Sequence, residues 1–376
     1  MRTVLFLHSS AGLYGADRQL LTIAGGLDRT RFASVVVLPE QGPLAGLLEK
    51  AGVTVELQPL ALLGPSGAAS TARVARDRMA LGRLAKRHKA ALVHSNTSLV
   101  LAGAPTARRA GLPHVVHVRE LVDDGVLPKL RERVGDAAAL VCVSDAVAGQ
   151  FGGAPNVQLI RDCLGRQPNT SIGAVVRKAM KIENDAFVVT QIARLADGKG
   201  QDVLARALAE PALAEIGAVG LVLGDPHPGG EAAGPALDAL VAELGLGERL
   251  RVLGFRDDIG TLLGASDAVA LPATRPEPAS QVTLEAAWAG LPIVASDLGG
   301  LPEQVQHEET GLLVPAGDHE ALARALRELA DDRERAKTMG EAGARRVRDA
   351  GGCERLIEEV QALYDRVAPV PVRRGL

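Results

Sequence analysis

The sequence is poor in aromatic residues, and this scarcity excludes one broad class of binding surface. Phenylalanine, tyrosine and tryptophan make up only 2% of the 376 residues. Proteins that hold single-stranded nucleic acid stack successive bases on aromatic side chains, and this chain has little material for such a surface. We therefore expect no nucleic-acid partner.

Long apolar segments and a cysteine framework are also missing. No apolar run approaches the roughly 18 residues that a membrane-spanning helix needs. The opening MRTVLFLHSS has one Arg and a short apolar run without a cleavage site, so it predicts a first strand rather than a signal peptide. Three widely spaced cysteines, Cys142, Cys163 and Cys353, indicate buried or idle thiols rather than disulfides or a metal site. We expect a cytoplasmic protein.

What is present suits a globular protein of two domains. The chain is 47% hydrophobic and 23% charged, and its length allows two cores of ordinary size. Residues 1–165 carry 19 Lys and Arg against 13 Asp and Glu, a net charge of +6, which leaves −9 for the remainder of a chain whose total is −3. A basic first half suits an anionic acceptor or a membrane surface, although modest imbalance also serves solubility alone.

Short apolar runs alternate with stretches of helical period, which predicts parallel sheets covered by helices. The first series places strands at Thr3–His8, Ser34–Leu38, Val53–Leu57, Leu92–Ser95, Val115–Val118 and Leu140–Val143. The second places them at Phe187–Ile192, Val219–Leu223, Arg251–Leu253, Ala268–Leu271, Ile293–Ala295 and Leu312–Val314.

Two carboxylates mark the stretch around which the second half is organised. Glu277 lies in a Pro/Ser-rich loop after a buried strand, and Glu285 lies on a helix expected over Gln281–Ala289. Open α/β sheets bind ligands at the carboxyl ends of their strands, where carboxylates can accept hydrogen bonds from a sugar or ribose. The alternative is a helix N-terminal Glu favoured by the dipole and an ordinary surface Glu.

A pair of cations follows an earlier strand of the same half. The segment QIARLADGKGQDVLARAL holds Arg194 and Lys199 between a strand and a helix, with Gly198 and Gly200 beside the lysine. Arg can bind phosphate oxygens in bidentate fashion, Lys acts as a point charge, and the helix N-terminus adds N–H groups. These residues predict a diphosphate site, and a solvated pair of charges is the alternative.

Together these motifs resemble the retaining glycosyltransferases of family 4, which have the two-domain GT-B fold. The resemblance covers residues 187–318 and includes R-L-x-x-x-K-G at the cations, Gly299-Gly300 after a strand, and G-L-L-V-P from Gly311. It implies an α/β protein in which two Rossmann-like, doubly wound parallel-sheet domains face each other across a cleft. The implied acceptor-binding domain is 1–165, the donor-binding domain is 166–353, and a final helix, about 354–376, packs back on the first domain.

The resemblance also implies roles for single residues. Glu277 would hold hydroxyls of the donor sugar, Glu285 the ribose, and Arg194 with Lys199 the diphosphate, whose developing charge they would neutralise. The nucleobase is expected near Phe255 and Arg256. The whole expected donor set is Gly15, Arg194, Lys199, Phe255, Arg256, Glu277, Ser280, Gln281, Val282 and Glu285.

The first domain carries further catalytic candidates. Family members often have a His just past the strand that ends at Val118, near the donor sugar. Here His117 lies two residues early, and Arg119 with Glu120 takes the usual His-Asp place, so His117 and Arg119 both stay candidates; for His117 a satisfied core histidine is the alternative. The expected catalytic residues are His117, Arg119, Glu277, Arg194 and Lys199, and the acceptor candidates are Tyr14, Asn96 and Glu120.

Two other segments of the first domain depart from the family. The chain has Tyr14-Gly15-Ala16-Asp17 where the family has Gly-Gly-Ala-Glu, and Asp162-Cys163-Leu164-Gly165 where the family has Asn-Gly-Val-Asp. Gly15 still lets the first loop approach a phosphate or an acceptor. Because G-x-G-x-x-G is absent there, the loop does not predict a dehydrogenase.

A basic amphipathic segment, Ala72–Lys89, precedes the fourth predicted strand. Apolar residues such as Leu81 and Ala85 share one helical face, and an arginine stripe lies beside it. The stripe from Arg73 to Lys89 is a candidate for peripheral contact with an anionic inner membrane face, and a solvated flank of a packed helix is the alternative.

These observations predict a retaining, nucleotide-sugar-dependent hexosyltransferase. Its acceptor hydroxyl would belong to a glycan, a lipid-linked glycan or a small natural product. No D-x-D motif follows a strand, so we expect neither a metal nor another cofactor. A nucleotide-sugar epimerase or hydrolase of the same fold would act without an acceptor, and a non-catalytic nucleotide-sugar-binding protein would bind donor without turnover; both remain alternatives.

Overall fold

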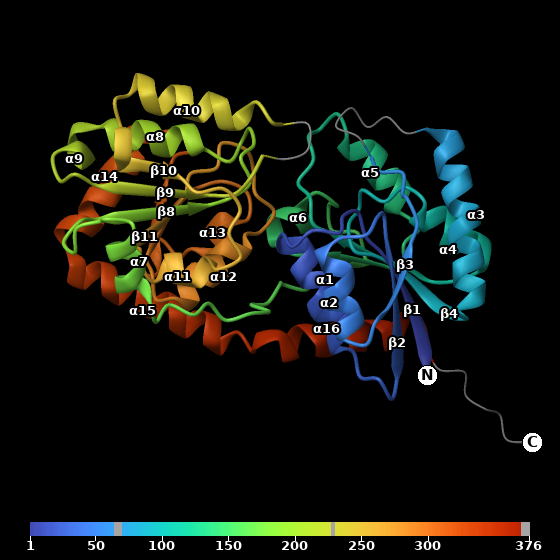
Figure 1. Ribbon diagram of the computed structural model, residues 1–376. Helices are drawn as coiled ribbons and strands as arrows, with labels where there is room; N and C mark the ends of the chain where they lie inside the picture. The colour runs from blue at the N-terminus through green and yellow to red at the C-terminus, as the bar shows by residue number, and fades with distance from the viewer. Residues whose placement is uncertain (64–69, 227–229, 370–376) are drawn as a thin grey trace, which may run out of the picture. The chain divides into compact units, whose positions relative to one another are not determined.

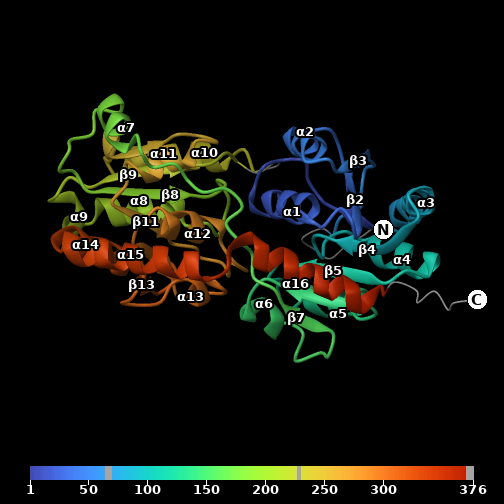
Figure 2. The same ribbon diagram turned by 90° about the horizontal axis from the view of Figure 1, so that it is seen from below.

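The structure is a computed structural model that describes residues 1–63, 70–226 and 230–369. The chain divides into two compact units, each built on one parallel sheet (Figures 1 and 2). Unit 1 consists of residues 1–165 and 353–376, and unit 2 of residues 166–352. The last part of the expected final helix, residues 370–376, lies outside the described residues.

Unit 1 has the strand order β3-β2-β1-β4-β5-β6-β7. The predicted series of strands is present, and β7 is an additional short, half-buried strand that the hydrophobic pattern did not indicate. The elements are β1 (Arg2–Leu7), α1 (Gly15–Gly26), β2 (Phe32–Leu38), α2 (Pro43–Lys50), β3 (Thr54–Leu57), α3 (Thr71–Arg87), β4 (Ala90–Ser95), α4 (Gly103–Ala110), β5 (His114–Val118), α5 (Leu127–Val134), β6 (Ala139–Cys142), α6 (Asp145–Gly149), β7 (Val157–Leu159) and α16 (Gly352–Val367).

Alternate side chains of each strand in unit 1 enter two different cores. Val4 and Phe6 of β1 pack with α1, α2 and α16, whereas Leu5 and Leu7 pack with α3 and α4. The strands therefore consist almost entirely of apolar residues, as expected of a parallel sheet covered on both faces.

Helix α16 belongs to unit 1 although it follows unit 2 in the sequence. It buries Leu356, Val360 and Tyr364 in the same core as α1, and Figures 1 and 2 both show it running along unit 1. At its far end Arg2 forms an ion pair with Asp365.

The structure corrects the expectation that the three cysteines are thiols. Cys163 and Cys353 form a disulfide with a Cα–Cα distance of 5.1 Å, across a sequence separation of 190 residues. The pairing depends on α16 returning to unit 1, which cysteine spacing cannot reveal. Cys142 is a free, buried thiol, and burial raises its pKa to about 12.

Unit 2 has the strand order β10-β9-β8-β11-β12-β13, and every strand predicted for it is present. Its elements are α7 (Gly173–Ala179), β8 (Val188–Ile192), α8 (Gln201–Ala209), α9 (Pro211–Ala214), β9 (Val219–Leu223), α10 (Ala233–Glu243), the 3₁₀ helix η1 (Gly247–Arg249), β10 (Leu250–Val252), α11 (Ile259–Leu263), β11 (Ala268–Leu271), α12 (Gln281–Trp288), β12 (Ile293–Ser296), α13 (Leu301–Gln304), β13 (Gly311–Val314), α14 (His319–Asp331) and α15 (Arg333–Asp349).

Helices cover both faces of this second sheet as well. Val189 and Val222 pack with α8, α10 and α14 on one face, and Val188 and Val269 pack on the other, where α7, α11 and α12 lie (Figure 1). Among the helices in the described part of the chain, none is long and apolar enough to span a membrane.

Candidate functional site

Each sheet contains a point at which its strand order reverses. In unit 1 this point lies between β1 and β4, and in unit 2 between β8 and β11. Ligands of open α/β sheets bind outside the carboxyl ends of the strands at such a point, because the connecting loops diverge there. Several of the polar side chains singled out in the sequence follow these four strands, and others lie on or after β5 and β10.

In unit 2 the reversal point carries an ion pair between two predicted donor-binding residues. Lys199 follows β8, Glu277 follows β11, and Lys199 Nζ bonds to Glu277 Oε1. The two side chains are 30% and 17% exposed, so each is only partly withdrawn from solvent. The structure thus brings together a cation suited to phosphate and a carboxylate suited to sugar hydroxyls, 78 residues apart in the sequence.

Glycines let the loops that carry this pair pack closely. Gly200 has φ +76° at the start of α8, and a Cβ there would lie 1.8 Å from the Pro272 carbonyl oxygen. Gly299 has φ +64°, and a Cβ there would lie 2.5 Å from the Glu277 carbonyl oxygen. Gly299 is therefore required by the close approach of the Glu277 backbone, and Gly200 by the entry of the chain into α8.

The remaining carboxylate and its neighbours lie on or before α12. Ser280 precedes the helix, and its backbone N–H donates to Gln304 Oε1 at 2.8 Å. Gln281, Val282 and Glu285 are half-buried, and Gln281 and Glu285 share one helical face because they are four residues apart. The Ser280 side chain does not cap α12, so the first N–H groups of this helix can serve a ligand.

Phe255 and Arg256, expected near the nucleobase, follow β10. Phe255 is 42% exposed, and its backbone N–H donates to Asp225 Oδ1 at 2.9 Å. Arg256 is held by Asp258 through hydrogen bonds of 2.8 and 2.7 Å. The loop after β10 thus presents an exposed aromatic ring on a backbone tied to the loop after β9.

In unit 1 the reversal point carries a buried polar cluster. His8 Nε2 bonds to Asp17 Oδ1 at 2.7 Å, and Asn96 Nδ2 donates to His8 Nδ1 at 3.2 Å. Since Nδ1 accepts from the Asn96 amide, the proton on Nε2 faces Asp17. Although burial opposes ionisation, hydrogen bonds from His8, Ser10 and the Tyr14 backbone hold the pKa of Asp17 below its ordinary value.

This cluster fixes the loop that departs from the family motif. Asp17 accepts from the Tyr14 backbone N–H at 2.8 Å, and α1 begins at Gly15, the residue after Tyr14. The sequence had pointed to Tyr14, Gly15 and Asn96 but not to His8 or Asp17. Two features of the sequence could have indicated them: a His just after the first strand and an acid in the first turn of the following helix.

A second buried chain joins three aromatic rings in unit 1. Tyr364 of α16 bonds to His94 Nδ1, and His94 Nε2 lies 3.1 Å from His117 Nδ1. Burial lowers the pKa of His94 to about 3, and burial with the charge of Arg119 lowers that of His117 well below its ordinary value. Both rings are therefore neutral near pH 7. Within the described residues, His117 Nε2 has no hydrogen-bond partner.

Arg119 connects two positions at which the sequence departs from the family. Its Nη1 donates to both carboxylate oxygens of Asp162, at 2.8 and 2.7 Å, and both side chains are largely buried. Arg119 stands in the family's His-Asp place and Asp162 in the linker that replaces Asn-Gly-Val-Asp. The largely buried Arg119 guanidinium thus has its counter-ion in Asp162.

Glu120, the third acceptor candidate, already has partners within unit 1. Its carboxylate accepts from the hydroxyls of Thr97 and Ser98 and, at 3.0 Å, from the Arg119 backbone N–H. It therefore ties the loop after β5 to the loop after β4. This arrangement gives Glu120 a structural role in the described conformation.

Two Rossmann-like units with polar side chains at the carboxyl ends of both sheets define the GT-B fold of glycosyltransferases. Residues 175–346 match the family model described as glycosyl transferases group 1. The crystal structure of HepE from Anabaena in complex with UDP and glucose is 26% identical, with a TM-score of 0.83, and the match covers 96% of this chain and 99% of that one.

Curated relatives are matched over part of their length. The D-inositol 3-phosphate glycosyltransferase of Salinispora tropica is 32% identical over 56% of this chain and 44% of its own. The GDP-mannose-dependent alpha-(1-6)-phosphatidylinositol monomannoside mannosyltransferase of Mycobacterium tuberculosis is 32% identical over 64% of this chain and 66% of its own. The fold, the family match and these relatives support a GT-B glycosyltransferase.

Proposed function

We propose that this protein is a retaining glycosyltransferase of family 4 that transfers a hexose from a nucleotide diphosphate sugar to an acceptor hydroxyl. The observation that carries the proposal is the Lys199–Glu277 pair at the reversal point of unit 2, inside the segment that matches the family model. Unit 2 would bind the donor and unit 1 the acceptor.

The chemistry of the pair suits the two halves of such a donor. Lys199 precedes the N-terminus of α8, so its ammonium and the first N–H groups of that helix can bind the diphosphate together. Arg194, whose backbone carbonyl accepts from Gln201 Nε2 of the same helix, is the second proposed cation. Glu277, released from Lys199, can accept hydrogen bonds from sugar hydroxyls. A donor would thus replace one internal ion pair by two sets of contacts.

In the proposed reaction the bond between the anomeric carbon and the phosphate oxygen breaks, and a bond to the acceptor oxygen forms on the same face. The leaving phosphate takes the acceptor proton, so no protein carboxylate has to become a nucleophile. Arg194 and Lys199 stabilise the charge that develops on the leaving diphosphate. His117 and Arg119 of unit 1 each hold polar atoms without a partner in the described part of the chain, which a sugar hydroxyl could satisfy.

Donor binding is the first test, with UDP-glucose as the first donor because HepE is known in complex with it. UDP, GDP, ADP and dTDP and their sugar conjugates would be titrated by thermal shift and calorimetry. One nucleotide family should raise the melting temperature of the wild type by mass action. Lys199→Ala should lose about tenfold or more in affinity, since hydrogen bonds to charged groups contribute about 1.5–3 kcal/mol.

The matched control is Lys337→Ala, which removes an exposed lysine from α15 of the same unit. Equal losses in the two variants, or no nucleotide response at millimolar concentration, would contradict the donor site. Turnover with an acceptor separates a transferase from a binding protein, and the anomeric configuration of the product by NMR checks retention. We also propose metal independence: turnover should persist in excess chelator, and a loss that magnesium restores would contradict this.

A further inference from the structure

A groove between α3 and α4 of unit 1 lies outside the candidate site. It has a volume of about 590 Å³, within the usual range of small-molecule sites. Ala90, at the start of β4, and Leu112, just before β5, line its floor, so the groove lies at the amino ends of these strands. The candidate residues follow the carboxyl end of β4, roughly 17 Å away along a strand of that length.

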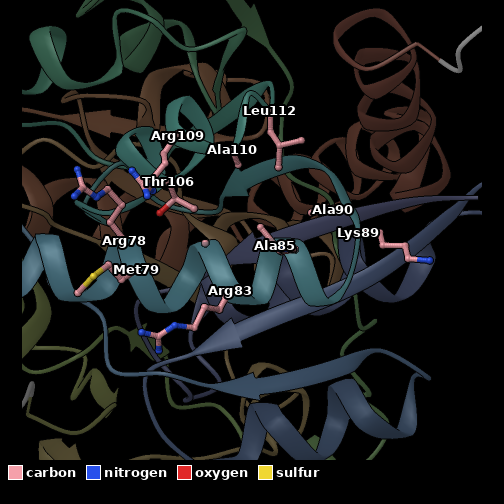
Figure 3. Close-up of a pocket in the computed structure, with 12 residues that line it drawn as sticks. Arg78, Met79, Arg83, Ala85, Lys89, Ala90, Thr106, Arg109, Ala110 and Leu112 are labelled. Carbon is pink, nitrogen blue, oxygen red and sulfur yellow. The ribbon is translucent and has the colours of Figure 1, made fainter.

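Among the described residues that line this groove, five are cations and none is an acid. Figure 3 shows Arg78 extending from α3 and Arg109 from α4 toward the same position, whereas Arg83 and Lys89 extend away from that position. Its cationic lining residues are Arg78, Arg83, Lys86, Lys89 and Arg109. Their side chains form no hydrogen bond or ion pair with any described residue, although most arginines of this unit are paired with an acid or a carbonyl.

Helix ends explain only part of this concentration of charge. Lys86 lies in the last turn of α3 and Arg109 in the last turn of α4, where cations are favoured by the helix dipole. Arg78 and Arg83 lie in the interior of α3, and Lys89 lies beyond its end. Unpaired like charges around one concave surface repel each other, and an anion bound between them would relieve that repulsion.

A buried hydroxyl independently indicates a polar ligand. Thr106 of α4 lines the groove, is 1% exposed, and has no partner for Oγ1 among the described residues. Figure 3 places it between the two helices, beside Arg78 and Arg109. Leaving a buried hydroxyl unbonded is unfavourable, so a site whose ligand accepts this hydrogen bond is favoured over a bare patch of surface charge.

We propose that the groove between α3 and α4 binds a phosphate-bearing anion, held by Arg78, Arg109 and the Thr106 hydroxyl, while the other three cations add to the positive field around it. The apolar face of α3 is already used, because Leu81 and Ala85 pack in the core of unit 1. Insertion of α3 into a bilayer is therefore disfavoured, and any membrane contact of this stripe would be made through lipid phosphates. The ligand chemistry is the same for a soluble phosphate compound and for an anionic lipid headgroup.

The test compares two pairs of substitutions that remove equal charge. Arg78→Gln with Arg109→Gln removes two groove cations, and Lys129→Gln with Lys50→Gln removes two exposed cations of the same unit outside the groove. All proteins, full-length, also carry Lys199→Ala to weaken the donor site. Inorganic tripolyphosphate is titrated by calorimetry at two salt concentrations, and cosedimentation is measured with phosphatidylcholine vesicles, with and without phosphatidylglycerol.

The groove pair should lose about tenfold or more in affinity relative to the control pair, and added salt should narrow the difference. Thr106→Val, which keeps the shape but removes the hydroxyl, should lose affinity severalfold without unfolding. Tripolyphosphate binding alone indicates a soluble ligand, and preferential binding to anionic vesicles indicates a headgroup. Equal affinities in the two pairs, or no binding of either probe, would overturn the proposal whether or not the donor site proves correct.

Discussion

The buried histidines of unit 1 connect its last helix to its candidate site. Each hydrogen-bonded imidazole nitrogen in the Tyr364–His94–His117 chain either donates or accepts. Whether the Tyr364 hydroxyl donates to His94 or accepts from it therefore fixes the tautomer of His117, two hydrogen bonds away. Without the Tyr364 hydroxyl, both His94 and His117 could adopt either tautomer. Tyr364 is thus a positioning residue for His117 rather than a group that meets substrate.

These neutral histidines predict a loss of stability in mild acid. Burial lowers the pKa of His94 to about 3 and that of His114 to about 4, whereas the unfolded chain titrates near 6.5. Between these values the unfolded state binds more protons, so stability is complete above pH 6.5 and is lost as the pH falls. Each histidine should cost about 2 kcal/mol by pH 5.

Hydrogen exchange of β4 and β5 measures this change in unit 1, and the fluorescence of Trp288, the single tryptophan, follows unit 2 as an internal control. His114→Gln should reduce by about one the number of protons taken up on unfolding of unit 1, and so make its stability less dependent on pH. The same pH slope in both units, with no effect of His114→Gln, would show that the buried histidines are not its source.

At the scale of elements, helix packing in unit 2 depends on a glycine contact away from the loops of the site. Helix α15 approaches the end of α12 so closely that a Cβ on Gly340 would lie 1.8 Å from the Gly290 carbonyl oxygen. Helix α12 begins just after Glu277 and carries Glu285. The position of α15 therefore supports the backbone on which both carboxylates depend.

Gly340→Ala should destabilise unit 2 by about 1–3 kcal/mol, because α15 must move away from a carbonyl group that cannot yield. Gly234→Ala in α10 is the matched control, since a Cβ there meets only one side-chain atom, 4.0 Å away. The control should be neutral or stabilising by up to about 1 kcal/mol. Urea unfolding followed by Trp288 measures both, and similar midpoints would refute the packing argument.

At the scale of the whole molecule, the disulfide joins the two points at which the chain passes between the units. Cys163 lies two residues before the boundary at Gly165, and Cys353 is the first residue after unit 2. The closed loop therefore contains all of unit 2. Unit 2 can stay folded while unit 1 opens. The chain between the two cysteines therefore gains less conformational entropy on opening than a flexible loop spanning 190 residues would.

Cys353→Ser should lower the free energy of opening of α16 and its partner strands by about 2–4 kcal/mol and leave unit 2 unchanged. Hydrogen exchange with and without reductant measures this, and the reduced wild type should match the variant. Thiol titration of the unfolded, non-reduced protein should find one thiol, that of Cys142. Three titrating thiols would contradict the disulfide.

The sequence by itself determined the order of strands and helices and the positions of the donor motifs. Hydrophobic period and glycine placement are local properties, so the strands of both sheets were predicted within one or two residues. Among the strands in the described residues, β7 alone was not predicted, because its three half-buried residues carry no clear period. Arg194, Lys199, Glu277 and Glu285 were recognised because their motifs lie within short segments.

Only the tertiary structure decided which of these residues meet. Lys199 and Glu277, Arg119 and Asp162, Cys163 and Cys353, and His94 and Tyr364 are separated by 78, 43, 190 and 270 residues, respectively. Such partners are set by which strands are neighbours in a sheet and by where α16 packs. Sequence spacing does not reveal which residues become partners, because these contacts form when the apolar faces of whole helices and strands are buried together.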